Sequence, residues 1–409
     1  MLYINSFIFL LTISISTLVV PSIVPKISLL TSILLLGAIL LNSMFSNSFS
    51  LSKSSNSRSL NKPIGFENIN IPYLAIFLLF LWKLVRYFYV ESNIYSDLNL
   101  IVMHVLFLFF IVMTSKSISS YIKTYVYFVF IMAFLGLVAN TLFIFDFINP
   151  DNHGANISIM TNGAFTRDAD FLESYVFPYY LGFILTGDGQ LNLLGFEFYR
   201  ISGWAHEPTS ATLFIAPAIL ILLHGDIINN KLLRTVMLFT IGLFWFFVMS
   251  VGSMLAFMTL YSLIALFYFY QHFFHKSRIM AAIFMVFIIS IPFLFIYVEP
   301  ILQSTIFTSK FNLEAHTLST AYNKITWFIP DINKSTIFYF SHLALWAIIL
   351  TFLLSSILIL ISNTPNKVYS LILLYIVIHS MKGSQETVFY LTFTFFWLYI
   401  AYFSWHKSV

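Results

Sequence analysis

The segment RISGWAHEP, residues 200–208, gathers groups that can bind and activate a substrate. Arg200 supplies a permanently charged planar fork that matches phosphate oxygens. His206 and Glu207 can each accept a proton as a general base. Gly203 lacks a side chain, so a ligand could approach the backbone closely there. These residue types predict an anion site beside a proton acceptor.

An apolar run, TSATLFIAPAILILL, follows this segment directly. Pro208 suits the first turn of a helix, where its missing N–H costs nothing. We therefore expect a helix over 208–224 that begins at the end of RISGWAHEP. The free N–H groups and the positive dipole end at its start favour an anion. The alternative interpretation is a capped helix with surface charges.

Composition indicates the environment of these groups. The chain has 409 residues, of which 59% are hydrophobic and 9% are charged, values far from those of soluble domains. A membrane crossing needs about 20 apolar residues, and the chain contains about a dozen such runs. The sequence thus predicts an all-α polytopic membrane protein. The lack of cysteine excludes disulfides and thiolate metal sites, and a net charge of +4 is too small to suggest nucleic acid.

We expect about twelve transmembrane helices in a single integral membrane domain, 1–409. Their predicted spans are 3–20, 27–46, 72–90, 98–115, 124–146, 208–224, 235–250, 254–271, 279–298, 339–361, 368–380 and 387–403. Two longer connections, 147–207 and 299–338, carry enough aromatic residues to suit folded caps. The Ser/Asn-rich stretch 47–71 is predicted to be a flexible linker.

Basic residues predict the orientation of the helices. Every second loop is basic, which indicates that these loops and both termini face the cytoplasm. The two long connections then lie outside, as does the start of the helix at 208–224. The basic residues of these loops and of the C-terminal end are Lys53, Arg58, Lys62, Lys116, Lys123, Lys231, Arg234, Lys276, Arg278, Lys367 and Lys407.

An Arg-x-x-Gly stretch followed by Glu-Pro at a helix start, in a chain of this length and helix number, resembles the bacterial O-antigen polymerases, the Wzy-type lipid-linked polysaccharide polymerases. A second match, SVGSMLAFMTLY at 250–261, resembles a Ser-rich turn of these polymerases and of the related ligases. Val251 and Gly252 stand where that turn frequently carries an arginine, so it lacks the family's cation.

The resemblance implies a fold like that of the multi-helix (GT-C-like) membrane glycosyltransferases. It implies polymerisation of undecaprenyl-diphosphate-linked oligosaccharide repeat units at the periplasmic face of the bacterial inner membrane, without a metal or other cofactor and with inversion. The expected partners are the lipid-linked donor and acceptor, membrane lipid and a chain-length regulator. Arg200 would bind the diphosphate, and Glu207 and His206 are the candidate general bases.

Further basic residues are candidates for binding the diphosphate or the sugars. Lys83 and Arg86 share one face of the third predicted helix, where they would line a cavity or reach the membrane surface. His104 could join them, or could be a hydrogen-bonded core residue. The second long loop contributes Lys310, His316 and Lys324, and the turn HSMKGSQE at 379–386 contributes Lys382. Solvated loop charges are the alternative interpretation of these residues.

Other sites and functions stay open at this stage. Asp168 and Asp170 have the spacing of a DxD metal motif, but we expect no metal there. An O-antigen ligase, which passes the glycan to a lipid A core, would use a similar scaffold and donor. A flippase or transporter of the same lipid is the alternative from another class. Transporters usually place ionisable groups near the membrane midplane, whereas the polar residues here concentrate in outside loops.

Overall fold

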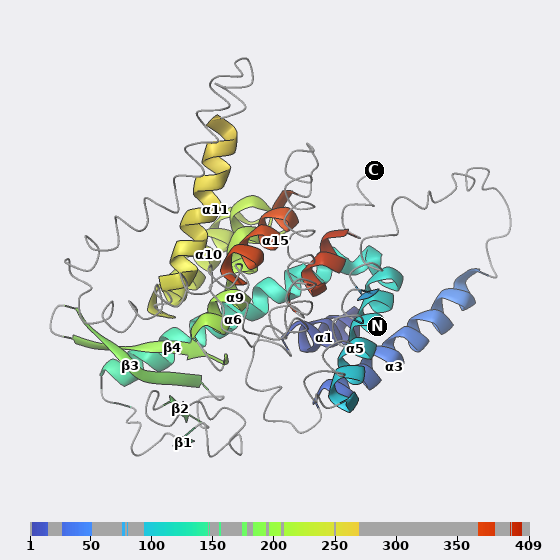
Figure 1. The fold of residues 1–409 in the computed structure, drawn as a ribbon, viewed down its shortest axis with the longest axis horizontal. Helices are drawn as coiled ribbons and strands as arrows, with labels where there is room; N and C mark the ends of the chain where they lie inside the picture. Colours follow the sequence, from blue (N-terminus) through green and yellow to red (C-terminus); the bar gives the residue numbers. More distant parts are fainter. Residues whose placement is uncertain are drawn as a thin grey trace, which may run out of the picture. The chain divides into compact units, whose positions relative to one another are not determined.

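The computed structural model describes residues 2–14, 27–50, 76, 77, 80, 94–145, 147, 155, 156, 174–177, 183–193, 196–205, 208–248, 251–269, 367–380, 393 and 395–402 (Figure 1). The chain divides into two compact units. The first comprises Met1–Ser253 and Phe340–Val409, and the second comprises Met254–Tyr339. The description below concerns the first unit, apart from the part of α11 that follows Ser253.

Helices account for most of the described residues. They are α1 (Leu2–Ser14), α3 (Ile27–Ser50), α5 (Ile94–Met113), the short 3₁₀ helix η2 (Ser115–Ser117), α6 (Ile118–Ile144), α9 (Pro208–His224), α10 (Lys231–Val248), α11 (Val251–Phe269) and α15 (Lys367–Ser380). Residues 393 and 395–402 are also helical. Each of these helices overlaps a predicted span, and α9 has the predicted bounds.

Two described helical stretches, Ser115–Leu142 and Lys231–Val248, are long and apolar enough to cross a membrane. Five described helical stretches of 10–17 residues are apolar but shorter. The spans predicted at 279–298 and 339–361 lie outside the described residues, as does the whole loop 299–338. The linker predicted at 47–71 overlaps the end of α3, which continues to Ser50.

The first long connection contains an antiparallel sheet, so the all-α prediction was incomplete. Its strands are β1 (Ala155–Asn156), β2 (Ser174–Phe177), β3 (Phe183–Leu193) and β4 (Phe196–Gly203), in the order β1-β2-β3-β4. The register of β3 and β4 shifts between Thr186 and Leu191. The intervening residues include Gly-Asp-Gly at 187–189, which is typical of a turn. Because of these turn residues, the sequence pattern does not predict the 11-residue strand β3.

Polar side chains of α1, α3 and α5 meet one another between the helices. Asn5 and Asn42 form a reciprocal amide pair, with N···O distances of 3.2 and 3.3 Å. The Ser32 hydroxyl donates to the Asn99 side chain at 3.3 Å. Hydrogen bonds of this kind join helices in an apolar environment, where water does not compete for the polar groups.

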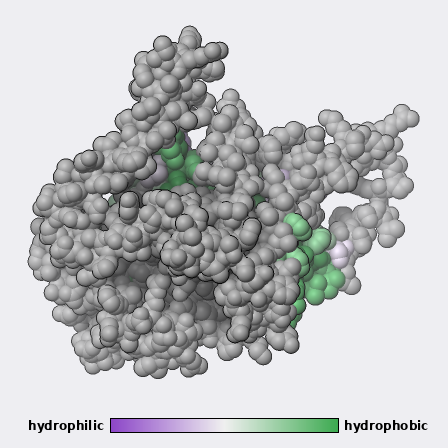
Figure 2. All heavy atoms as spheres, viewed as in Figure 1, coloured by the Kyte–Doolittle hydropathy of each residue, from purple (hydrophilic) through white to green (hydrophobic). Residues whose placement is uncertain are grey.

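Helix α10 has large apolar side chains on both its buried and its exposed face. In α10, one face is buried, comprising Met237, Ile241, Phe244 and Val248. The other face is exposed and equally apolar, comprising Leu232, Val236, Phe239, Leu243 and Phe246, and Phe239 is 71% exposed. Where described residues reach the face drawn in Figure 2, the surface is mostly hydrophobic. A helix that is apolar all round is typical of burial in a protein core or a membrane.

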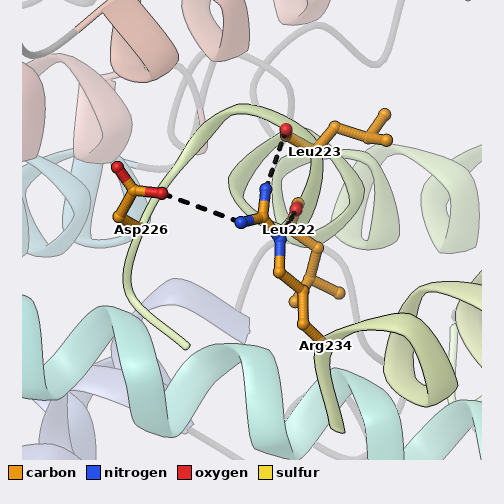
Figure 3. Close-up of polar contacts among 4 residues, drawn as sticks. All are labelled: Leu222, Leu223, Asp226 and Arg234. Atoms are coloured by element: carbon orange, nitrogen blue, oxygen red, sulfur yellow. Dashed lines mark hydrogen bonds and ion pairs between the residues drawn. The ribbon is translucent and has the colours of Figure 1, made fainter. Parts of the chain in front are cut away.

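Arg234 closes the turn between α9 and α10 (Figure 3). Its guanidinium donates to the carbonyls of Leu222 and Leu223, the latter at 2.9 Å. These carbonyls lie in the last turn of α9, where a helix lacks partners of its own. The ion pair of Arg234 with Asp226 is longer, at 3.7 Å, and the Asp226 side chain is fully exposed. The carbonyl bonds are therefore the stabilising part of this contact.

Replacing Arg234 with alanine should lower the stability of the protein by about 1.5–3 kcal/mol, the range for hydrogen bonds that involve a charged group. Arg234→Lys keeps the charge but loses the planar fork, so its midpoint should lie between those of the alanine variant and the native protein. Asp226→Asn is the control and should leave the midpoint unchanged. The measurement is thermal unfolding in detergent. Equal losses in Asp226→Asn and Arg234→Ala would show that the ion pair, not the helix cap, stabilises the turn.

Candidate functional site

Strand β4 carries RISGWAHEP into the helices. The strand contacts α6, α9 and α10. Ile201 and Ala205 are fully buried, and the Trp204 ring lies 5.4 Å from that of Phe128 in α6. Residues 200–205 are thus held by the sheet and by the helices around them.

Gly203 occupies a tight position at the end of β4. Its φ of +59° is left-handed, a conformation that side chains other than glycine adopt at a cost. A Cβ atom there would lie 2.9 Å from Cζ of Phe244 and 3.8 Å from Cγ of Met132. The space beside Gly203 is filled by these two side chains. Backbone conformation and packing therefore explain the glycine, and the space that its residue type suggests for a ligand is filled by protein side chains.

Helix α9 begins at Pro208, as predicted, and contains Pro217. A proline inside a helix removes one backbone donor and strains the turn before it. The Tyr125 hydroxyl of α6 donates a hydrogen bond to the carbonyl of Phe214 in this turn. The rings of Tyr125 and Phe214 also meet edge to face, 5.2 Å apart. This pair anchors α9 to α6 beside the irregular turn.

A buried polar cluster joins α9, α10, the start of α11 and α15. Thr212 Oγ1 lies 3.3 Å from Nε2 of His379, and the His379 ring lies 5.5 Å from that of Tyr375. The Tyr375 hydroxyl lies 2.7 Å from Oγ of Ser253, which accepts a hydrogen bond from Trp245 Nε1 at 3.0 Å. We call these five residues the polar cluster.

The polar cluster brings together segments that are far apart in the sequence. Thr212 lies one turn after the start of α9 at Pro208, Ser253 belongs to the second matched stretch, 250–261, and His379 opens the turn 379–386. In the predicted topology, the helix ends that hold them all face outside.

Sequence reasoning missed Thr212, Trp245 and Tyr375 as members of this cluster. Each is a single polar group within an apolar run, a pattern shared by many residues that only pack. Ser253 and His379 lie inside the stretches 250–261 and 379–386, but their residue types alone predict no role for them. Polar residues recur near the predicted outer ends of these helices. This pattern indicates that they contact one another only once the helices are known to be neighbours.

His104 is a core residue in the structure. Its side chain is fully buried, with ring centroids 5.4 and 5.0 Å from those of Phe395 and Phe396. Tyr399 lies 6.3 Å away. Of the two interpretations of His104, the structure supports the core residue packed by aromatic rings.

The structure describes few of the other predicted site residues. Arg200 lies in β4, where its backbone is paired in register with Thr186 of β3. The predicted site residues outside the described part of the chain are His206, Glu207, Lys83, Arg86, Lys310, His316, Lys324 and Lys382, and the DxD residues Asp168 and Asp170 also lie outside it. Within the described part, no three His, Asp or Glu side chains gather as a metal site would require.

The sequence matches no protein-family model, and comparisons with curated proteins and with solved structures also gave no match.

Replacing Gly203 with alanine should destabilise the protein by about 1–3 kcal/mol, because a non-glycine residue is strained at this φ and its Cβ would press on the Phe244 ring. Gly242→Ala in α10 is the matched control. It has open space beside it and lies inside a helix, where alanine is favoured by about 0.5–1 kcal/mol. The measurement is the thermal midpoint of each variant in detergent. A Gly203→Ala protein as stable as Gly242→Ala would contradict the packing seen here.

Proposed function

We propose that the chain is an integral membrane protein of the bacterial inner membrane with about twelve transmembrane helices. The apolar exposed faces of α10 and the inward polar pairs of α1, α3 and α5 support this proposal, because lipid favours both features. The two long connections then lie on the periplasmic side, and both termini lie in the cytoplasm.

We propose further that the protein polymerises undecaprenyl-diphosphate-linked oligosaccharide repeat units into an O-antigen-type polysaccharide. The observation that carries this proposal is the convergence of three stretches on one end of the helix bundle. They are the start of α9, which continues the segment 200–208, the start of α11 and the end of α15, which meet through the polar cluster. The first of these follows, and the second lies within, a stretch that resembles this polymerase family.

The proposed reaction moves the growing glycan from its lipid diphosphate to a hydroxyl of the next lipid-linked repeat unit. The bond from the anomeric carbon to the diphosphate breaks as the bond to the acceptor oxygen forms. The protein then has to neutralise the departing diphosphate, align two long substrates and accept one proton. Direct attack inverts the anomeric centre.

The residues of RISGWAHEP suit these tasks by type. Arg200 would hold the diphosphate, and Glu207 or His206 would take the proton of the acceptor hydroxyl. Side-chain cations would take the place of a metal, with Lys83, Arg86, Lys310, His316, Lys324 and Lys382 as further ligands of phosphate or sugar. The burial of Ile201, Gly203 and Ala205 supports a fixed backbone for this segment, as an aligned reaction requires.

Arg200→Ala should abolish chain elongation while the protein remains inserted and stable, because the guanidinium is the first candidate to stabilise the departing diphosphate. Cells whose own polymerase gene is replaced by the variant should display a single repeat unit on the lipid A core. Arg58→Ala, in the predicted cytoplasmic linker, is the matched control and should leave the polymer length distribution unchanged.

Long polymer in the Arg200→Ala strain would remove Arg200 from the reaction. The same gene replacement separates the alternatives. Loss of an O-antigen ligase would leave polymer on the lipid carrier and a bare core. A flippase would move lipid-linked repeats across liposome membranes without changing glycan length.

A further inference from the structure

The contact between Thr212 and His379 joins the start of α9 to the end of α15. Thr212 lies four residues after Pro208, one turn inside α9, and His379 is the penultimate residue of α15. Their side-chain atoms are 3.3 Å apart although 167 residues separate them in the sequence. Helix α9 is the element that continues RISGWAHEP, so its first turn fixes where that segment ends.

One face of α15 contacts both α9 and the start of α11. Tyr375 and His379 are four residues apart, which places them on the same face of the helix, and their rings contact each other. His379 reaches α9 through Thr212, and Tyr375 reaches the start of α11 through Ser253. Trp245 adds the end of α10 by its bond to Ser253. The polar cluster therefore sets the spacing of four helix ends.

The burial of these side chains excludes them from direct contact with a substrate. Thr212, His379, Ser253 and Tyr375 are at most 1% exposed. A lipid-linked diphosphate outside the bundle cannot touch side chains that are closed off in this way. In an apolar interior a hydrogen bond between side chains meets no competition from water, so it holds one geometry. The effect of this cluster on a substrate is consequently indirect.

We infer that Thr212 and His379 are positioning residues of the proposed polymerase site, which hold the start of α9 and the end of α15 together in the geometry required for glycosyl transfer. The inference rests on the proposed function. It assigns to α15 a role that neither sequence match contains, because α15 lies outside both matched stretches. Substrate binding by residues of the segment 200–208 is not part of this role.

The test is a steady-state assay of purified protein with a synthetic undecaprenyl-diphosphate-linked repeat unit. Thr212→Val removes the hydroxyl at nearly constant size and should lower kcat about 10- to 100-fold, the effect of misplacing reacting groups by about 1 Å. The KM for the lipid-linked unit should stay close to the native value. The thermal midpoint should fall, because the buried His379 nitrogen loses the Thr212 hydroxyl as a partner, but the protein should remain folded at the assay temperature. Thr212→Ser, which keeps the hydroxyl, should retain most of the native kcat.

Two sets of variants make the result specific. Thr12→Val is the matched control, since Thr12 is also fully buried but donates within its own helix to the carbonyl of Ile8. It should leave kcat unchanged. His379→Leu should lower kcat at least as much as Thr212→Val, because it also removes the ring contact with Tyr375, whereas His379→Gln, whose amide can take the place of Nε2, should recover activity. The double variant Thr212→Val/His379→Leu should lose no more rate than His379→Leu alone, because both substitutions remove the contact between Thr212 and His379.

The inference is overturned if the native protein elongates glycan and Thr212→Val and His379→Leu do so at the native kcat. It is also overturned if their loss of rate only follows a loss of folded protein, or if KM rises while kcat is retained. A native protein that makes no polymer from the lipid-linked unit overturns the proposed function and this inference with it.

Discussion

The apolar outer surface of the helices is the constraint from which the rest of the structure follows. Helix α10 exposes leucine, valine and phenylalanine along one face and buries equally apolar residues along the other. The exposed polar side chains of this helix, Lys231 and Thr235, lie at its start, and the rest of its exposed face is apolar. Polar groups must therefore meet one another between helices, as the amides of Asn5 and Asn42 do.

The same constraint explains the form of the candidate site. Threonine, serine, tyrosine, tryptophan and histidine from different helices collect in the polar cluster because each finds its partner there. Strand β4, which contains Arg200, contacts α6, α9 and α10. Gly203 allows the close fit, since its left-handed backbone and missing side chain leave room for Phe244. The segment 200–208 therefore contains both a residue that is required for packing, Gly203, and a candidate for the chemistry, Arg200.

Elements with local signals could be predicted from the sequence, and α9 is the clearest example. Pro208 marks its start and Gly225 follows its end, so both predicted bounds agree with the structure. Helix α6 begins at Ile118, six residues before its predicted start at 124. The sequence predicts that Lys123 lies in a basic loop, whereas in the structure Lys123 lies within the helix. Tyr121 and Ile122 are buried, so the start of α6 lies in the protein interior.

Features that depend on distant partners could not be predicted in this way. The strand β3 was missed because Gly-Asp-Gly interrupts its pattern, and only pairing with β2 and β4 makes it a strand. The contact of Thr212 with His379 has no local signature at all, since it depends on α9 and α15 being neighbours. The segment 200–208 was recognised from its residue types, whereas the reason for Gly203 needed the position of Phe244.

Side-specific labelling tests the central claim most directly, namely that the helices cross a membrane with the sheet and the segment 200–208 on the outer side. The chain contains no cysteine, so one introduced thiol is the only one to react. Phe147, just beyond α6, and Asp226, between α9 and α10, are both exposed. In intact spheroplasts a membrane-impermeant maleimide should label Phe147→Cys at once and Asp226→Cys only after permeabilisation. Labelling of both from the outside, or the reverse pattern, would contradict the account.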